Sequence, residues 1–251
     1  MIEHQNFRVP QGSILSPDLF NLYFTELQNK IELPCFQYAD DTTILAHGKP
    51  NDLSSLETAP NEDLAKLTSW YSSTNLALNP NKTKIMVMST KQLSKHHNLE
   101  DYNPVLKIGE KYLEREHCSK MLGVVFNEHL SLDDHIAKVT SSCFYSMSVL
   151  RKFKYLMPYK LKRQVVELLV LSKMYHVDAV IRPLPLRLLK RLQKVQNAAA
   201  SFVLGRYAKE KDVVTLGRLP MKERRDWHLL NLSHKYVHDD RKPKYIDRSL
   251  N

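Results

Sequence analysis

The sequence predicts an α+β protein in two parts, with short strands and helices in residues 1–127 and a mostly helical region in residues 128–251. In the first part, β-branched and aromatic residues flank turn signals, which is typical of hairpins. In the second part, apolar residues recur every three or four positions, which is typical of helices. The charge changes at the same place, so we expect two domains that meet near residue 128.

The charge difference between the two parts is large. Residues 1–127 carry 12 Lys and Arg against 15 Asp and Glu, and residues 128–251 carry 25 against 12, which together are the 37 basic and 27 acidic residues of the chain. A basic half beside a near-neutral half favours a polyanionic partner such as nucleic acid. Solvated helix faces would give the same surplus, and the charge alone does not separate the two interpretations.

The first part is expected to begin with a helix over residues 16–31, with Ser16 as N-cap and Pro17 in the first helical position. A β-hairpin is expected over residues 36–46. A helical turn over 52–57 should then stop before Pro60, and Asn61 should cap a second helix. Short strands are expected at residues 76–78, 84–88, 105–108 and 121–126.

The second part is expected to form a series of helices. The first starts near Asp133, and its apolar face is marked by Ile136, Val139, Cys143, Met147 and Leu150. Further helices are expected over residues 159–179, 185–204 and 221–238. Trp70, in the first part, is expected to lie in the core, as an aromatic residue at helical spacing usually does.

Composition limits the classes to which the protein can belong. Its three cysteines are odd in number and lack CxxC spacing, so a disulfide framework is not expected. His96 and His97 have no partners at zinc-ligand spacing. The sequence shows no signal peptide and no apolar run of the ~20 residues that span a bilayer. A nuclear or cytoplasmic protein that does not enter the membrane is expected.

The segment Tyr38-Ala39-Asp40-Asp41 is the strongest candidate for a functional site. Its two acids fall where the predicted hairpin must turn. Mg²⁺ is usually held by one or two carboxylates together with substrate phosphates, and adjacent carboxylates at a rigid tip suit that task. The alternative is a structural one, because Asp is common in turns for its local hydrogen bonding.

A second candidate lies upstream, where Gln11 and Gly12 precede the predicted first helix. Glycine permits a positive φ or a close approach of backbone to a ligand. A loop of this kind, anchored by a helix, can lay its backbone against a nucleotide or a template strand.

These segments together resemble the reverse transcriptases of non-LTR (LINE-type) retrotransposons. Residues 9–17 and 20–23 are similar to motif B of that family, and Tyr38-Ala39-Asp40-Asp41 is similar to motif C. Residues 70–88 resemble motif D, and residues 121–124 resemble the segment that ends the palm. Residues 192–199 and 219–224 resemble the helical tail that follows. The resemblance covers nearly the whole chain, in the family's order.

The resemblance implies a partial right-hand polymerase palm, motifs B to E, followed by a thumb-like helical tail. It implies RNA-directed DNA polymerase chemistry, in which deoxynucleoside triphosphates extend a DNA 3′ end on an RNA template with two Mg²⁺ ions. Asp40 and Asp41 would be catalytic metal ligands. Lys82 would neutralise charge or act as a general acid at the pyrophosphate, although a solvated turn lysine explains it equally well.

The resemblance also implies roles for four further residues. Gln11 and Gly12 would position template or nucleotide. Tyr38 and Ala39 would pack beside the primer end and the nucleotide sugar.

The sequence departs from the family in two ways. Arg8 stands where the family usually has Gly, and the motif A strand, which supplies another metal-binding Asp, is not in the sequence. Asp18 suits a helix first turn for its charge alone, and we do not assign it to catalysis. We therefore expect this chain alone to be inactive or nearly so. The alternatives are a non-enzymatic nucleic-acid-binding remnant and a decayed transposon relic.

Overall fold

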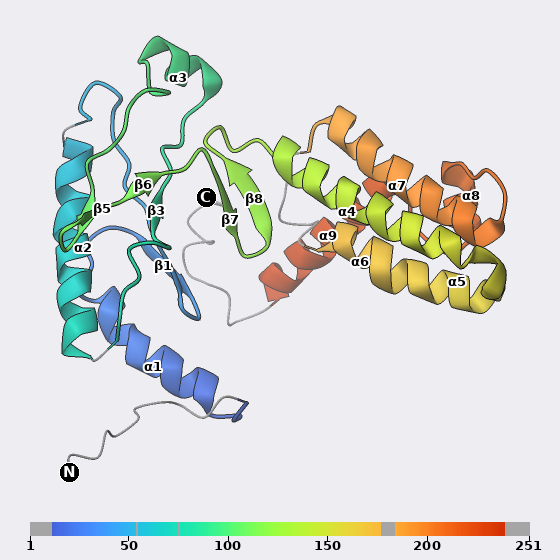
Figure 1. The fold of residues 1–251 in the computed structure, drawn as a ribbon, viewed down its shortest axis with the longest axis horizontal. Coiled ribbons are helices and arrows are strands. Elements are labelled where there is room, and N and C mark those ends of the chain that lie inside the picture. The colour runs from blue at the N-terminus through green and yellow to red at the C-terminus, as the bar shows by residue number, and fades with distance from the viewer. Residues whose placement is uncertain (1–11, 54, 75, 177–183, 239–251) are drawn as a thin grey trace. The chain divides into compact units, whose positions relative to one another are not determined.

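The computed structural model describes residues 12–53, 55–74, 76–176 and 184–238 (Figure 1). The chain divides into two compact units, Met1–Cys118 and Ser119–Asn251, and each is described by itself. The division falls ahead of the boundary expected near residue 128, because the strand that precedes residue 128 packs with the helices that follow it.

The first unit combines helices with three separate two-stranded sheets. β1 and β2 are antiparallel, β3 and β6 are parallel, and β4 and β5 are antiparallel. The elements are α1 (Ser16–Gln28), β1 (Cys35–Tyr38), β2 (Asp41–Ile44), α2 (Ser55–Ser73), β3 (Lys84–Ile85), α3 (Lys91–His96), β4 (Lys107–Ile108), β5 (Lys111–Tyr112) and β6 (Glu114–Arg115). The mixture of helices and small sheets agrees with an α+β fold.

The start of α1 differs from the prediction. Ser16 is already helical; the N-cap is Leu15, whose backbone is αR with φ −83° and ψ −14° and whose side chain makes no capping hydrogen bond. The Ser16 backbone N–H instead donates to the Ser13 carbonyl at 3.3 Å. The chain therefore turns before Ser16, which removes the extended backbone that an N-cap needs.

The predicted break at Pro60 is also wrong. α2 runs through Pro60 without interruption, and Asn61 lies inside the helix rather than capping it. Asn61 has a different task, because its side-chain amide donates to the carbonyls of Glu57 and Val105, each at 2.9 Å, and accepts from the backbone N–H of Lys107 at 3.1 Å. These bonds hold the segment that leads into β4 against α2, which offsets part of the cost of a proline in the helix.

An aromatic core joins α1 to α2, and the base of the β1–β2 hairpin packs against it. Phe24 meets Trp70 at 5.3 Å between ring centroids, and Trp70 meets Tyr71 at 5.3 Å, both edge to face. Trp70 is buried, as predicted. Cys35 and Ile44, at the base of the hairpin, pack against this cluster. The hairpin is therefore attached at its base.

The buried carboxylate of Asp63 ties the chain between α1 and β1 to α2. It accepts the backbone N–H groups of Leu33 at 2.9 Å and Glu32 at 3.1 Å, and it pairs with Lys66 at 3.2 Å. Burial opposes ionisation, but the hydrogen bonds from Leu33, Glu32 and Lys66 outweigh it and lower the Asp63 pKa.

The second unit is a helical bundle preceded by the antiparallel β7–β8 pair, drawn in green in Figure 1. Its elements are β7 (Cys118–Met121), β8 (Val124–Asn127), α4 (Asp133–Lys152), η1 (Lys154–Leu156), α5 (Tyr159–Val166), η2 (Glu167–Leu171), α6 (Ser172–Tyr175), α7 (Leu186–Leu204), α8 (Glu210–Thr215) and α9 (Met221–His238). One core cluster runs through it and includes Ile136, Cys143, Met147 and Leu150, as predicted for the face of α4, while Val139 is half-buried.

Three strand and helix predictions need correction. Residues 76–78 form no strand, although they lie in the described part of the chain. The segment 121–126 is not a single strand, because Leu122 and Gly123 adopt φ of +47° and +87° and turn the chain between β7 and β8. The helix predicted over 159–179 is α5, a π-helical turn η2 and α6 in succession, and residues 177–179 lie outside the described residues.

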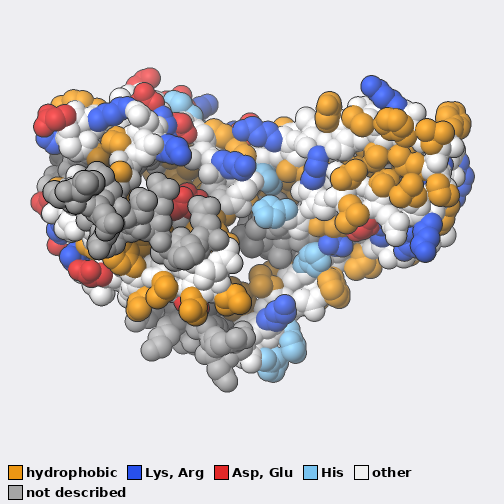
Figure 2. Space-filling model, turned by 60° about the horizontal axis from the view of Figure 1, so that its bottom comes forward, with side chains coloured by type: hydrophobic (Ala, Val, Ile, Leu, Met, Phe, Trp, Pro, Cys, Tyr) orange, Lys and Arg blue, Asp and Glu red, His pale blue; other side chains and the backbone are white. Residues whose placement is uncertain are grey.

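The surface of the second unit is both basic and apolar. Figure 2 shows hydrophobic side chains gathered over this unit, at the right of the view, with Lys and Arg side chains spaced around them. Within the described ranges, no helix is both long enough and apolar enough to cross a bilayer. The cysteines Cys35, Cys118 and Cys143 carry free thiols, and burial raises the pKa of Cys143 to about 11.

We expect Asp63→Asn to lower the free energy of unfolding of the first unit by about 2 kcal/mol, because asparagine lacks the charge that strengthens the bonds from Leu33 and Glu32 and removes the ion pair with Lys66. The measurement is urea unfolding followed by Trp70 fluorescence in a Trp227→Phe background, since the chain has two tryptophans. Because the folded Asp63 pKa is lowered, its contribution is complete above about pH 4 and is lost as the pH falls through the folded pKa. The Asp63→Asn variant should lack this acid-dependent fall in the free energy of unfolding.

The matched control is Asp101→Asn, which changes an exposed acid of the same unit. Equal unfolding midpoints for the two variants at pH 7 would show that Asp63 does not hold the first unit together.

Candidate functional site

The β1–β2 hairpin places Asp40 and Asp41 at its tip. The strands pair in the register Cys35 with Ile44 through Tyr38 with Asp41, which leaves Ala39 and Asp40 as a two-residue turn. Tyr38 and the residues of the turn are exposed, and so is Asp41. The inward half-buried positions Cys35 and Ile44 fix which way the hairpin faces, because strand side chains alternate between faces.

Ala39 adopts a backbone conformation that its side chain disfavours, with φ +52° in the left-handed region. Two-residue hairpin turns need positive φ in this place and usually meet it with Gly, Asn or Asp. An alanine there costs roughly 1–2 kcal/mol. Such local strain persists only where the surrounding structure fixes the conformation, here by the hairpin pairing and the attachment of the base.

One carboxylate at the tip influences a residue of the aromatic core. Burial raises the pKa of Tyr71, and the negative charge of Asp40 adds to this effect. The Asp40 charge therefore acts on the Tyr71 hydroxyl of α2, although the Asp40 side chain is exposed. The sequence did not suggest that Tyr71 interacts with the site. It indicated only that Tyr71 belongs to the apolar face of α2.

The chemistry of the tip fits a divalent cation with oxygen ligands. Asp40 and Asp41 supply two adjacent, accessible carboxylates, and Mg²⁺ takes one or two carboxylates and completes its shell with water and substrate phosphate. Among the described residues, no group of three or more His, Cys, Asp and Glu side chains forms a cage for a metal. A cation at this tip would therefore need further ligands beyond Asp40 and Asp41.

Lys82 lies in a separate turn of the same unit. Its backbone N–H donates to the Asn79 carbonyl at 3.1 Å, and the Thr83 N–H donates to the same carbonyl at 3.2 Å. Asn81 is bonded to Lys111 of β5, which ties this turn to a second hairpin. In the described part of the chain, Lys82 forms no ion pair with Asp40 or Asp41, so the structure does not join it to the carboxylates.

The motif B segment is described only from Gly12 onward, and Gln11 lies outside the described residues. Gly12 has φ +86°, and a Cβ built on it would meet no atom within 4 Å. A glycine was expected here for a positive φ or for a close approach of the backbone to a ligand, and the structure shows the positive φ. Tyr38 is 66% exposed, which leaves its ring available beside the carboxylates.

Residues 3–126 match the family model described as "Reverse transcriptase (RNA-dependent DNA polymerase)". The matched segment contains the hairpin tip, Lys82 and Gly12, and it ends within β8. No curated protein matches the chain, and no solved structure matches it. The sequence of the first unit is thus similar to reverse transcriptases, as the motifs predicted, and the match does not distinguish a subtype.

We expect Ala39→Gly to leave the free energy of unfolding unchanged or to raise it by up to about 1 kcal/mol. Relief of the strained φ outweighs or balances the extra entropy of the unfolded chain. The same change at an exposed helical position, Ala65→Gly in α2, should lower the free energy of unfolding by about 0.5–1 kcal/mol. Urea unfolding of both variants provides the comparison, and a loss of similar size at both positions would contradict a strained turn.

Proposed function

We propose that the first unit is part of the palm of a LINE-type reverse transcriptase and takes part in RNA-directed DNA synthesis. The observation that carries the proposal is the pair Asp40 and Asp41, exposed at a two-residue turn within the segment that matches the reverse transcriptase family. Its partners would be an RNA template, a DNA primer and deoxynucleoside triphosphates. A protein of a retrotransposon would act in the nucleus or the cytoplasm.

Asp40 and Asp41 would hold the catalytic Mg²⁺. When bound, two such ions activate the attacking 3′-hydroxyl and neutralise the leaving pyrophosphate. The hairpin would contribute rigidity, because its base packs on the aromatic core. Positioning of charge, rather than covalent chemistry by side chains, would be the contribution of the protein.

The residues around the tip would orient the substrates. Tyr38 and Ala39 flank the carboxylates, and we assign them to the primer end and the nucleotide sugar. Gln11 and Gly12 would contact template or nucleotide. Lys82 would reach the pyrophosphate once nucleotide is bound, and its place in an exposed turn is compatible with such a role.

We also propose that residues 1–251 alone have little or no polymerase activity. Two ions that share a triphosphate need more oxygen ligands than two adjacent carboxylates supply. A third carboxylate from another polypeptide segment would complete the site. Under this proposal the chain carries half of the metal site.

A second candidate is nucleic-acid binding without catalysis. The surplus of basic residues in 128–251 supports it, because exposed cations such as Arg151, Lys152, Lys190 and Lys194 lie on the helices of the second unit. Affinity of this kind weakens steeply with salt. It would not change when Asp40 and Asp41 are neutralised.

The experiment for the metal site measures Mn²⁺ binding by electron paramagnetic resonance, with and without a deoxynucleoside triphosphate. We expect the triphosphate to tighten Mn²⁺ binding by the protein, and Asp40→Asn with Asp41→Asn to weaken it about tenfold or more, because the carboxylates would be direct ligands. The control pair is Glu100→Gln with Asp101→Asn, two adjacent exposed acids of the same unit. Equal binding by both double variants would overturn the assignment.

Primer extension on an RNA template tests the proposed inactivity. Extension should not exceed that of the Asp40→Asn, Asp41→Asn variant. Extension by the purified chain that this double variant abolishes would show a complete active site.

A further inference from the structure

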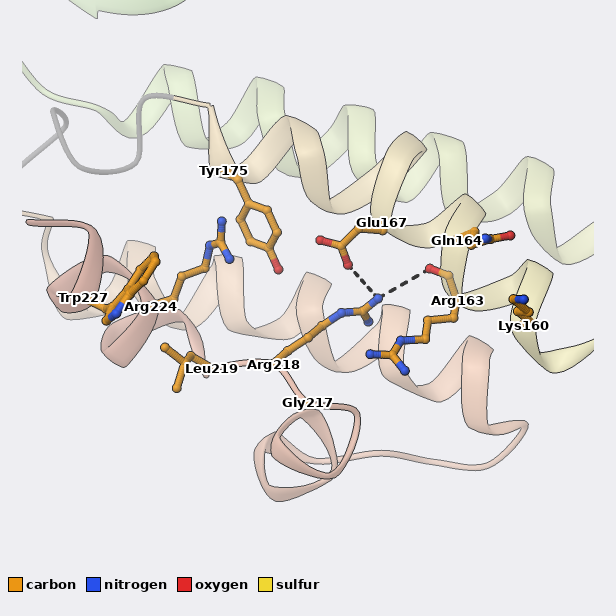
Figure 3. Close-up of a pocket in the computed structure, with 10 residues that line it drawn as sticks. All are labelled: Lys160, Arg163, Gln164, Glu167, Tyr175, Gly217, Arg218, Leu219, Arg224 and Trp227. Atoms are coloured by element: carbon orange, nitrogen blue, oxygen red, sulfur yellow. Dashed lines mark hydrogen bonds and ion pairs between the residues drawn. The ribbon is translucent and has the colours of Figure 1, made fainter. Parts of the chain in front are cut away.

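A basic groove with aromatic residues lies within the second unit and has a volume of about 650 Å³ (Figure 3). Its walls come from α5, η2, α6, α9 and the segment between α8 and α9. The residues that give it its character are Lys160, Arg163, Arg218, Arg224, Tyr175 and Trp227. Glu167 is the acidic residue among the ten that line it, so four cations face one anion.

The sequence places these residues on common faces. Lys160, Arg163 and Glu167 are spaced by three and four along α5 and the start of η2, so they project to the same side. Arg224 and Trp227 are three apart on α9. Gly217 and Arg218, between α8 and α9, bring a further cation between the two helical faces.

Hydrogen bonds fix two of the guanidinium groups in the groove. Arg218 has a side chain only 11% exposed and pairs with Glu167 at 2.7 Å. Arg163 donates to the carbonyl of Leu216 at 3.1 Å, which leaves its other N–H groups for a ligand. Cations held in this way lose little side-chain entropy when an anion binds.

The aromatic residues form the other component. The Arg224 guanidinium lies 3.3 Å from the centroid of the Tyr175 ring, a cation–π contact that orients it. Trp227 is 55% exposed at the edge of the groove. In Figure 3, Trp227 and Lys160 lie at opposite ends, with the guanidinium groups between them. A row of cations that ends in an exposed indole is the pattern of a single-stranded nucleic-acid site.

We propose that this groove binds single-stranded nucleic acid, with phosphates along the cations and an unpaired base stacked on Trp227. A duplex offers phosphates but keeps its bases stacked, so it would not use the indole. An acidic peptide would use the cations and not the indole. The inference deepens the second candidate function, nucleic-acid binding, and rests on it; it uses no residue of the metal site.

The experiment uses the full chain and fluorescein-labelled 12-nucleotide oligo(dT) and oligo(U), with binding followed by fluorescence anisotropy. Trp227→Ala should weaken binding about tenfold or more, and Trp227→Phe should restore much of it, because stacking needs an aromatic face. The control is Tyr207→Ala, an aromatic residue of the same unit that is 79% exposed and does not line the groove. It should bind as the unchanged chain does.

Two charge variants test the phosphate contacts. Lys160→Glu should weaken binding and reduce the salt slope by about 0.7, whereas Lys211→Glu, at an exposed lysine on α8 away from the groove lining, should have a smaller effect. Glu167→Gln should tighten binding up to about fivefold, because it removes the negative charge from the groove while the amide oxygen can still accept from Arg218. A gain of affinity cannot arise from misfolding.

The outcomes separate the groove from nucleic-acid binding in general. Two results would contradict the proposed groove but leave nucleic-acid binding in general as the function. One is salt-sensitive binding that neither Trp227→Ala nor Glu167→Gln changes. The other is equal affinity for a blunt 12-base-pair duplex. Absence of binding to any oligonucleotide overturns both. Oligo(Glu) that competes as well as oligo(dT) identifies an acidic peptide site instead. A preference between oligo(dT) and oligo(U) identifies DNA or RNA as the source of the strand.

Discussion

The carboxylate of Asp63, buried beneath the chain between α1 and β1, is the interaction on which the first unit depends. It binds the two backbone N–H groups at the point where the chain leaves α1, and it does so from the middle of α2. Without this carboxylate, the two backbone N–H groups would lose their hydrogen-bond partner inside the protein. The hairpin leaves the core only two residues later, so its direction is set by this anchor and by the aromatic cluster below it.

The two units use charge in opposite ways. In the first, adjacent carboxylates are left exposed on a strained turn, where a cation and its phosphate ligand can reach them. In the second, guanidinium groups are paired with carbonyls, one carboxylate and an aromatic ring. The first arrangement suits a metal that arrives with its substrate, and the second suits an anion that meets cations already in place.

Local patterns in the sequence predicted local structure well. The alternation around Asp40 and Asp41 gave the hairpin almost to the residue, and the helical periodicity after Asp133 gave α4. The errors arose where tertiary contacts decided the outcome. Pro60 predicts a helix break, but the bonds from Asn61 to the segment before β4 keep α2 continuous. Ser16 fits the N-cap pattern, but the chain already turns between Ser13 and Ser16.

The two candidate sites also differ in whether local sequence or tertiary packing brings their residues together. The carboxylates are neighbours in sequence, so the motif itself located them. The groove could not be predicted, because its cations come from α5, α9 and the segment that precedes α9, and only the packing of these helices brings Lys160 and Trp227 to one surface. The surplus of basic residues in 128–251 is visible in the sequence, but it does not reveal the aromatic partners.

The π-helical turn η2 has a consequence for insertions and deletions in this part of the chain. The Ser172 N–H donates to the Glu167 carbonyl, five residues back, so η2 holds one residue more than an α-helix would. The wide turn takes up that residue, so its removal would close the turn to the α-helical repeat and leave α5 and α6 in nearly the same relative phase, whereas removal of a residue from α6 before Tyr175 would rotate the end of α6 by about 100°. Tyr175 would then leave the ring of Arg224. A change of length by one residue is therefore compatible with the groove at η2, but not in the residues between η2 and Tyr175.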